Sequence, residues 1–496
     1  MTSHPHNARS DRPHGQDRAA GGSGAGPSPA RTGTPWRGRL LAAGLGAAVL
    51  AATVTACGPA STPDSGKKPT GSPGAKSPSP KRPFAPPILE QAWKSAPVTG
   101  DLLRTRLLGS WRTDTALYVG RGTGITVLDP VTGKQLGTIE PPEPGLSACG
   151  MSDGLSKDGL GALAWLKGDP GSPTATCDHI TLIDTRNHNT ARWTATVSAE
   201  PLGGKPLTDD TTRLGFTGDV LAVMTGNTVV GLRTDKTTAW TWKNPGVGPD
   251  TYVLNWDMAI GPDRIAVLLG TEHGATWTYD IATLDENGKQ LSAMPAPMPT
   301  PKDGSIDLVS AAPMTALVRP DSFDHTTPPE LVTFTREGAV ARRIKLATQA
   351  GPATIGQFNL LGRAEKHNVQ LTDTTAYVAA GDSLSTVGAP TQVAAFDLAS
   401  GTHRWTRPVG EAAQPRFVGA DDDTVYVLGG KSIADMELYA YSAKTGDRTK
   451  ISTVKAPDSL FMLSSAITDY ASGSLATITT GSSPGPGIFM FRAPSS

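Results

Sequence analysis

The sequence lacks several motifs that identify common enzyme classes. It contains no His-Glu-x-x-His zinc motif and no complete Gly-x-x-x-x-Gly-Lys-Ser/Thr phosphate loop. Only three cysteines occur in 496 residues, with no adjacent pair and no Cys-x-x-Cys. The sequence therefore gives no motif for a zinc protease, a P-loop nucleotidase or a dithiol oxidoreductase.

An excess of either charge is also missing. Lys plus Arg and Asp plus Glu both number 45, so the formal net charge is zero. A balanced chain has no general basic field for nucleic acid and no acidic field for cationic partners. Strong helical periodicity is absent beyond the N-terminal region. The 56 glycines and 42 prolines favour short strands and turns.

A strand and turn unit is clearest over Leu117–Ile139. Apolar and β-branched runs alternate there with a glycine-rich hairpin and the reverse turn Asp129–Gly133. The same turn recurs before a strand that often carries Trp, and its opening residue is found at positions 129, 184, 234, 285, 335, 397 and 442. The separations are close to fifty residues, which predicts an array of four-stranded β-propeller blades.

The ends of the repeat region predict how the ring closes. The last blade has candidate strands at Leu475–Thr479 and Gly487–Phe491, but no fourth strand follows. Ile88–Trp93 resembles a fourth strand without partners, so we expect it to complete the last blade and remove the open edge. The sequence thus predicts an all-β domain over 88–492. It forms a single β-propeller of eight four-stranded blades, or of seven if one blade has been split.

The first 87 residues differ in composition and divide into three segments. Residues 1–36 have few large apolar side chains and are expected to be disordered. Residues 37–56 contain Arg37, Arg39 and an apolar run that suits a secretory signal. Residues 57–87 are rich in Pro, Ser, Gly and Lys, which predicts a flexible tether.

The apolar run ends in Val54-Thr55-Ala56-Cys57, which resembles the lipobox of bacterial lipoprotein signal peptides. The resemblance implies that Cys57 is acylated and becomes the new N-terminus. The alternative is an uncleaved membrane anchor, since the run is close to the ~20 residues that span a bilayer. Both interpretations place the domain on the extracytoplasmic face of the cell membrane.

The blade pattern, best seen at Leu117–Ile139 and at Ala376–Trp405, resembles the pyrroloquinoline-quinone-type propeller repeat. That repeat occurs in quinoprotein dehydrogenases and in non-enzymatic lipoproteins, including the propeller subunit of the outer-membrane β-barrel assembly machinery. The dehydrogenases carry a disulfide between adjacent cysteines and a calcium site. This sequence has no adjacent cysteines, so neither the quinone cofactor nor calcium is carried over, and we expect no cofactor and no metal.

Cys149 and Cys177 both fall in the second blade, where they are expected to form a disulfide. A redox or metal role is the alternative, with His179 as the one nearby ligand type. Asp421–Asp423 is expected to be a solvated turn rather than a cation site. The repeat Trp residues at 193, 240, 242 and 405 are expected to pack between blades.

Two functions from different classes follow from these features. The preferred hypothesis is a lipid-anchored, monomeric, non-catalytic propeller that binds or scaffolds a cell-envelope protein or other extracellular ligand through its blade loops. The alternative is a quinoprotein-like oxidoreductase or another enzyme with its site in the central funnel, for which no catalytic residue is identified. The irregular hairpins at 170–177, 319–330 and 382–390 interrupt the repeat, and binding is expected where the copies differ.

Overall fold

The computed structural model describes residues 88–494 with gaps at 101, 169–174, 188–189, 198–211, 246–252, 274–275, 298–303, 320–326, 349–350, 353–368, 381–390, 411–414, 431–434, 456–466 and 480–486. The expected N-terminal extension, signal peptide and tether, with Cys57, lie outside the described residues. The described part belongs to one compact unit, Arg82–Ser496.

The described residues form eight four-stranded blades, which confirms the predicted β-propeller and its eight blades. Six blades are separate sheets, and the last two are joined through β1 into one eight-stranded sheet. Within each blade neighbouring strands pair antiparallel, in sequence order except for β1. The first four blades are β2–β5 (Leu107–Arg112, Leu117–Arg121, Gly124–Leu128, Gln135–Ile139), β6–β9 (Ser147–Met151, Leu160–Lys167, Thr176–Asp184, Thr190–Thr196), β10–β13 (Arg213–Thr217, Val220–Thr225, Thr228–Leu232, Thr238–Lys243) and β14–β17 (Val253–Ile260, Arg264–His273, Thr276–Asp285, Gln290–Pro295).

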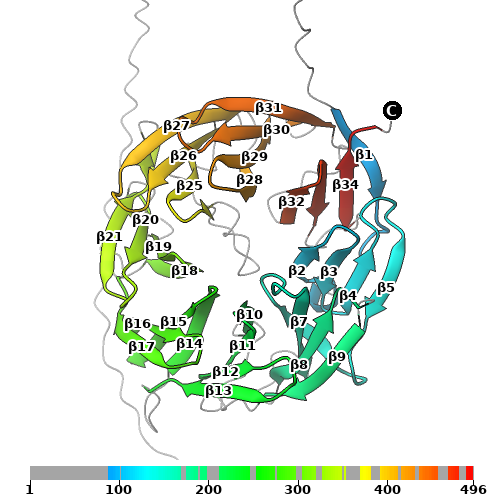
Figure 1. The fold of residues 1–496 in the computed structure, drawn as a ribbon, viewed down its shortest axis with the longest axis vertical. Helices are drawn as coiled ribbons and strands as arrows, with labels where there is room; N and C mark the ends of the chain where they lie inside the picture. Colours follow the sequence, from blue (N-terminus) through cyan, green and yellow to red (C-terminus); the bar gives the residue numbers. More distant parts are fainter. Residues whose placement is uncertain are drawn as a thin grey trace, which may run out of the picture. The chain divides into compact units, whose positions relative to one another are not determined.

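The remaining blades continue around the ring in chain order (Figure 1). They are β18–β21 (Ser305–Ala311, Met314–Arg319, Glu330–Phe334, Val340–Lys345), β24–β27 (Val369–Leu371, Thr375–Ala380, Thr391–Asp397, His403–Gly410), β28–β31 (Arg416–Ala420, Thr424–Gly430, Asp435–Ser442, Arg448–Lys455), and β32–β34 (Ile467–Ala471, Ser474–Ile478, Ile488–Arg492) with β1 (Ile88–Lys94). The first strand of each blade is the innermost one.

The eighth blade closes the ring as the sequence predicts. β1 pairs antiparallel with β34, placing Glu90 opposite Arg492 and Lys94 opposite Phe489. β1 also pairs in parallel with β31 of the seventh blade, through Ile88 and Leu89. The N-terminal strand therefore connects two blades, and a single chain completes the ring.

Three details of the blade layout differ from the sequence prediction or add to it. The innermost strand of the eighth blade is Ile467–Ala471, which overlaps the strand that the sequence predicts over Met462–Thr468, and residues 462–466 lie outside the described residues. The long interval before Asp397 holds one blade, as predicted, and adds the small β22–β23 pair (Ala347–Thr348, Gly351–Pro352).

A short helix, α1 (Leu102–Thr105), precedes β2, and no helix among the described residues is long and apolar enough to cross a membrane.

Apolar side chains fill the spaces between blades. The second and third strands are buried almost throughout, as in β11 and β12, whereas fourth strands such as β5 are mostly exposed. One core cluster, for example, joins Tyr118 and Val127 of the first blade to Leu163 and Trp165 of the second. Because successive side chains of a strand point to opposite faces of its sheet, each strand packs against both neighbouring blades.

The four Trp residues expected to pack between blades do connect successive blades. Trp242 packs in the cluster between the third and fourth blades, and its indole N–H donates to the Gln290 side chain at 3.1 Å. The other three, together with Trp93 of β1, donate to a backbone carbonyl in the reverse turn of the next blade. The four donor and acceptor pairs are Trp93 with Pro130 (3.3 Å), Trp193 with Thr234 (2.8 Å), Trp240 with Glu286 (2.9 Å) and Trp405 with Ala443 (3.1 Å). The first of these pairs joins the N-terminal strand to the first blade.

The turn glycine explains why the indole approaches so closely. Gly446 has a φ of 70°, which favours glycine, and a Cβ added to it would lie 2.5 Å from Cδ2 of Trp405. Gly133 has the same relation to Trp93. The turn therefore needs glycine both for its backbone conformation and for contact with the ring of the preceding blade.

Replacing Trp405 with Phe tests the contribution of this hydrogen bond. The Ala443 carbonyl belongs to a buried residue and loses its donor, so we expect Trp405→Phe to lower the free energy of unfolding by about 1–3 kcal/mol in urea denaturation. Trp193→Phe is the matched control, because its acceptor Thr234 is exposed and water replaces the lost donor. A loss at position 193 equal to that at position 405 would contradict this explanation.

Candidate functional site

The two faces of the ring are built differently. On one face, here called the turn face, strand 1 turns into strand 2 and strand 3 turns into strand 4. Most of these turns are short, for example 218–219, 472–473 and 286–289, and the connection 152–159 of the second blade is longer. On the other face, here called the hairpin face, lie the hairpins between strands 2 and 3 and the connections between blades. Because strands in a meander alternate in direction, every loop of one kind falls on the same face.

The strands that flank the three irregular hairpins of the sequence end on the hairpin face. They are β7 and β8, β19 and β20, and β25 and β26. Most of the residues between them, 169–174, 320–326 and 381–390, lie outside the described residues. The regular hairpins 122–123 and 226–227 lie on the same face. Cys177, expected in the first irregular hairpin, is instead part of β8.

The cysteine pair lies within the second blade. Cys149 and Cys177 form a disulfide across 28 residues, as predicted, and both residues are buried. The register of β6 shifts between Ala148 and Gly150, so Cys149 is the extra residue of a bulge. The disulfide joins β6 to β8 within one blade, and thereby fixes the strand that follows hairpin 168–175.

A redox or metal role of these cysteines was the alternative, with His179 as the nearby ligand type. Nδ1 of His179 contacts the Asp178 carboxylate at 2.8 Å. No group of three His, Cys, Asp or Glu residues among those described is placed to hold a metal ion. The disulfide is enclosed in the second blade and joins non-adjacent cysteines. It therefore does not fit the adjacent-cysteine arrangement that a quinone site of the resembled family requires.

Asp421 to Asp423 form a turn, as expected. The Oδ1 atom of Asp421 accepts hydrogen bonds from the backbone N–H groups of Asp423 and Thr424. The turn carboxylates of other blades do the same, and at Asp397 the Arg404 guanidinium and the backbone N–H and hydroxyl of Ser400 hold the carboxyl pKa well below its ordinary value. These acidic residues stabilise turns.

The innermost strands carry three aspartates, and each one accepts from an arginine. Arg213 of β10 lies 3.1 Å from Asp257 of β14, whose second oxygen accepts from the backbone N–H of Leu308 in β18. This carboxylate therefore joins three successive blades around the ring axis. Sequence reasoning missed the pair because the two residues are 44 positions apart in different repeats.

The other two aspartates make comparable contacts. Arg112 at the end of β2 lies 3.3 Å from Asp469 of β32 and also donates to the carbonyl of Ala471, so it connects the first blade to the eighth. Asp307 of β18 pairs with Arg319 of β19 at 2.5 Å. The innermost carboxylates thus serve as contacts between and within blades.

Two further groups have altered acidity through burial. Arg121 of β3 donates to the carbonyls of Thr105 and Thr479, and burial lowers its pKa to about 10. Burial also raises the pKa of Asp280, a partly buried carboxyl on β16. Arg121 has a structural role, because its acceptors lie on the strands and connections that surround it.

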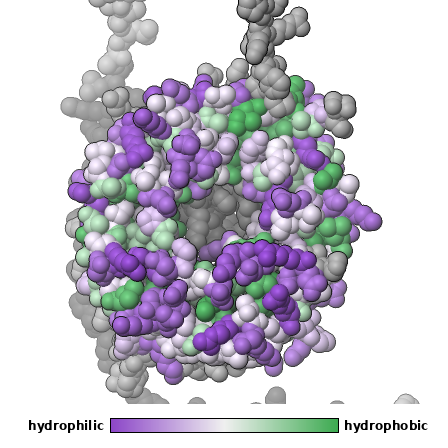
Figure 2. Space-filling view, in the orientation of Figure 1, coloured by the Kyte–Doolittle hydropathy of each residue, from purple (hydrophilic) through white to green (hydrophobic). Residues whose placement is uncertain are grey.

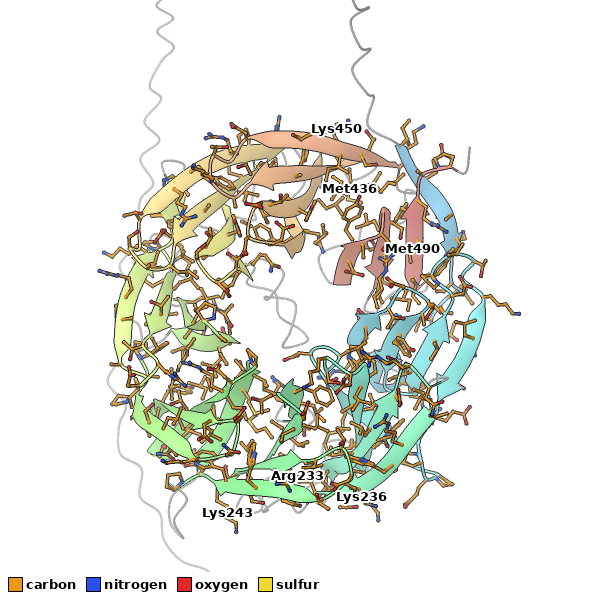
Figure 3. All side chains as sticks on the ribbon, viewed as in Figure 1. Arg233, Lys236, Lys243, Met436, Lys450 and Met490 are labelled. Atoms are coloured by element: carbon orange, nitrogen blue, oxygen red, sulfur yellow. A yellow bond between two sulfur atoms is a disulfide. The ribbon has the colours of Figure 1, made fainter. Side chains whose placement is uncertain are left out.

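The outer surface of the ring is mixed in character. Figure 2 shows a hollow at the centre and polar and apolar residues interspersed around it. Large exposed apolar side chains among the described residues are scattered over outer strands and turns, at Ile88, Val131, Leu136, Leu291 and Val340. Basic side chains such as Arg233, Lys236, Lys243 and Lys450 lie toward the outer rim (Figure 3).

Comparison with protein-family models gives no match, and comparison with curated proteins gives none. Solved structures resemble the chain at low identity. The quinohemoprotein alcohol dehydrogenase of Comamonas testosteroni is 11% identical with a TM-score of 0.43, over 83% of this chain and 78% of that one. The Pan2 WD40 domain of Neurospora crassa is 8% identical with a TM-score of 0.40, over 83% and 98%.

A third similar structure is the β-propeller domain of the Trilobed protease from Pyrococcus furiosus. It is 12% identical with a TM-score of 0.37, over 70% of this chain and 97% of that one. At these values the likeness transfers no residue and no activity to this chain. The assignment of a propeller follows from the strand order and pairing described above.

Removing the disulfide tests its role in the second blade. We expect the Cys149→Ala, Cys177→Ala double variant to lose about 3–4 kcal/mol of unfolding free energy in urea, because the disulfide restricts the unfolded chain. Reductant should produce the same loss in the wild-type protein and no change in the double variant. Free thiols at both positions in denatured, unreduced protein would contradict the pairing.

Proposed function

We propose that the chain is a lipid-anchored, extracytoplasmic β-propeller that acts as a non-catalytic binding or scaffold module for a cell-envelope partner. The difference between the two faces carries this proposal. The turn face is made mostly of short repeated turns, whereas the strands that flank the irregular hairpins of three blades end on the hairpin face, at Lys167, Arg319 and Ala380. Binding residues concentrate on loops that a rigid scaffold positions, so the hairpin face is the proposed contact surface.

Two features support the proposed location. The sequence Val54 to Cys57 has the residue types of a lipobox, with Cys57 as the lipidated residue. The disulfide between Cys149 and Cys177 suits an oxidising compartment outside the cytoplasm. The tether between Cys57 and Ile88 then holds the ring near the membrane surface, with an excess of Lys and Arg that favours anionic headgroups.

The contacts of the innermost strands support a non-catalytic role. Asp257, Asp307 and Asp469 are the carboxylates of these strands, and each is held by an arginine in a contact that joins strands or blades. Removing such a carboxylate would break a contact that holds strands or blades of the ring together, and would not remove a reacting group. The proposal includes no cofactor. A single chain closes the ring through β1, which supports a monomeric propeller.

Site-specific photo-crosslinking in intact cells tests which face binds. We place the crosslinker at three exposed lysines of the hairpin face, Lys167, Lys345 and Lys455, and at three exposed lysines of the turn face, Lys134, Lys236 and Lys444. One envelope protein is expected to be captured from the hairpin-face positions and not from the turn face. Capture from the turn face alone, or from neither face, would overturn the proposed surface.

Replacing Cys57 tests the anchor. We expect Cys57→Ala to abolish incorporation of an alkyne-labelled fatty acid, because the alanine has no thiol to acylate, while Cys149→Ala retains it. In-gel fluorescence after coupling to a dye measures the label. Persistent labelling of the Cys57→Ala protein would sink the lipoprotein assignment without affecting the binding proposal.

A further inference from the structure

The charges of the outermost strands are unevenly distributed around the ring. The fourth strand of each blade lies on the outside (Figure 1). β21, β27 and β31, of the fifth, sixth and seventh blades, contain three, two and three Lys or Arg residues, and none of them contains Asp or Glu. The fourth strands of the other five blades together contain three, at Lys94, Arg192 and Lys243. A chain without net charge thus concentrates positive charge on one side of its ring.

Carboxylates of the adjacent third strands neutralise three of these eight cations. The ion pairs are Arg343 with Glu330 (2.9 Å), Arg404 with Asp397, and Lys450 with Glu437 (2.5 Å). The carboxylate of Asp447, the residue before β31, accepts from the Thr445 hydroxyl. Five exposed or partly exposed cations form no ion pair with a described residue. These five are here called the basic wall: Arg342, Lys345, Arg407, Arg448 and Lys455.

Contacts across the joints between blades make the basic wall continuous. Arg342 of the fifth blade lies against Gly401 of the sixth, where an added Cβ would be 3.2 Å from its Cγ atom. Arg407 of the sixth blade donates to the Thr445 carbonyl of the seventh at 2.9 Å. Arg448 of the seventh blade donates back to the carbonyl of the residue after Arg407, at 2.7 Å. Because these acceptors are uncharged, the contacts position the guanidinium groups without neutralising them.

The segment that leads to the proposed lipid anchor enters the ring beside the basic wall. Ile88 and Leu89, at the start of β1, pair in parallel with residues 453 and 454 of β31. Lys455 of the basic wall follows directly. The sequence before Ile88, from Cys57 onward, also has more Lys and Arg than Asp and Glu. A Lys or Arg close to an anionic lipid surface favours binding to it by about fivefold.

We propose that the basic wall binds the anionic lipid headgroups of the membrane to which the chain is tethered. The inference rests on the lipid anchor of the proposed function. A fluid layer of phosphate groups can meet charges that are spread along the outer edge of three blades. The contact sets the ring on its edge. Lys345 and Lys455 lie where the basic wall meets the hairpin face, so a partner on that face adjoins the membrane.

Quenching of a fluorophore by lipid tests this contact. Thr449→Cys places a label on β31 in the basic wall, and Ala191→Cys places one on β9, in the second blade; both positions are exposed. Cys149 and Cys177 are paired, so the new thiol is labelled selectively. The full-length lipidated protein is reconstituted into phosphatidylcholine vesicles with or without phosphatidylglycerol. A lipid with a nitroxide headgroup is the quencher.

In the anionic vesicles we expect the label at position 449 to be quenched several-fold more strongly than the label at position 191. In neutral vesicles, or at high salt, the two labels should be quenched equally, because the attraction is absent or screened. Equal quenching of the two labels in anionic vesicles at low salt would overturn the lipid contact and leave an acidic macromolecule as the occupant of the basic wall.

Charge variants separate the basic wall from general attraction to anions. Arg342→Gln combined with Lys455→Gln should lower the ratio of docked to undocked protein roughly 5–30-fold in anionic vesicles. Arg233→Gln combined with Lys289→Gln removes the same charge from exposed positions at turns of the third and fourth blades, and should leave the ratio unchanged. An equal effect of the two pairs would overturn the proposal.

Flotation with neutral vesicles measures the anchor separately. Protein that floats but shows equal quenching at positions 449 and 191 in anionic vesicles overturns the basic wall and keeps the anchor. Protein that does not float with neutral vesicles overturns the anchor, and with it the inference that depends on it.

Discussion

The contact between a Trp of one blade and the reverse turn of the next is the interaction on which the ring depends. It combines a hydrogen bond, as from Trp405 to the Ala443 carbonyl, with contact between the indole and a turn glycine. A blade buries its faces only against its neighbours, so each needs a defined relation to the next. The contact involving Trp93 also fixes the N-terminal strand, and therefore ring closure, by the same chemistry.

The contact between Trp and the reverse turn restricts the sequence on the turn face more than on the hairpin face. All the Trp and turn contacts use loops of the turn face, where glycine conformation and acidic turn residues leave little freedom. Among the described residues these Trp contacts all reach turns of the turn face, so a change of sequence in the hairpins of the other face leaves them intact. The same division explains why the aspartates conspicuous in the sequence, including Asp129 and Asp397, have structural roles.

Much of the fold was predictable from the sequence because its signals are local. The spacing from Asp397 to Trp405 lies within one turn and strand, and it recurs. Ring closure was also predictable, since Ile88–Trp93 lacked partners at one end and the last blade lacked a strand at the other. The Cys149–Cys177 disulfide was predictable because both cysteines fall in one blade.

The contacts of the innermost strands were not predictable, because they depend on register. A shift of one residue would reverse the side of the sheet on which a side chain lies. Whether an arginine has a partner also depends on residues of other repeats, as Arg213 and Asp257 show. Neither fact is visible in the composition of a single repeat.

The position of β1 has a mechanical consequence. This strand is hydrogen-bonded to β34 on one side and, at its first residues, to β31 on the other. Ladder hydrogen bonds lie across the strand direction, so a pull along β1 from the chain before Ile88 loads them together in shear. Force entering through the N-terminal segment is therefore divided between two blades, and the ring resists opening at the point where its chain is attached.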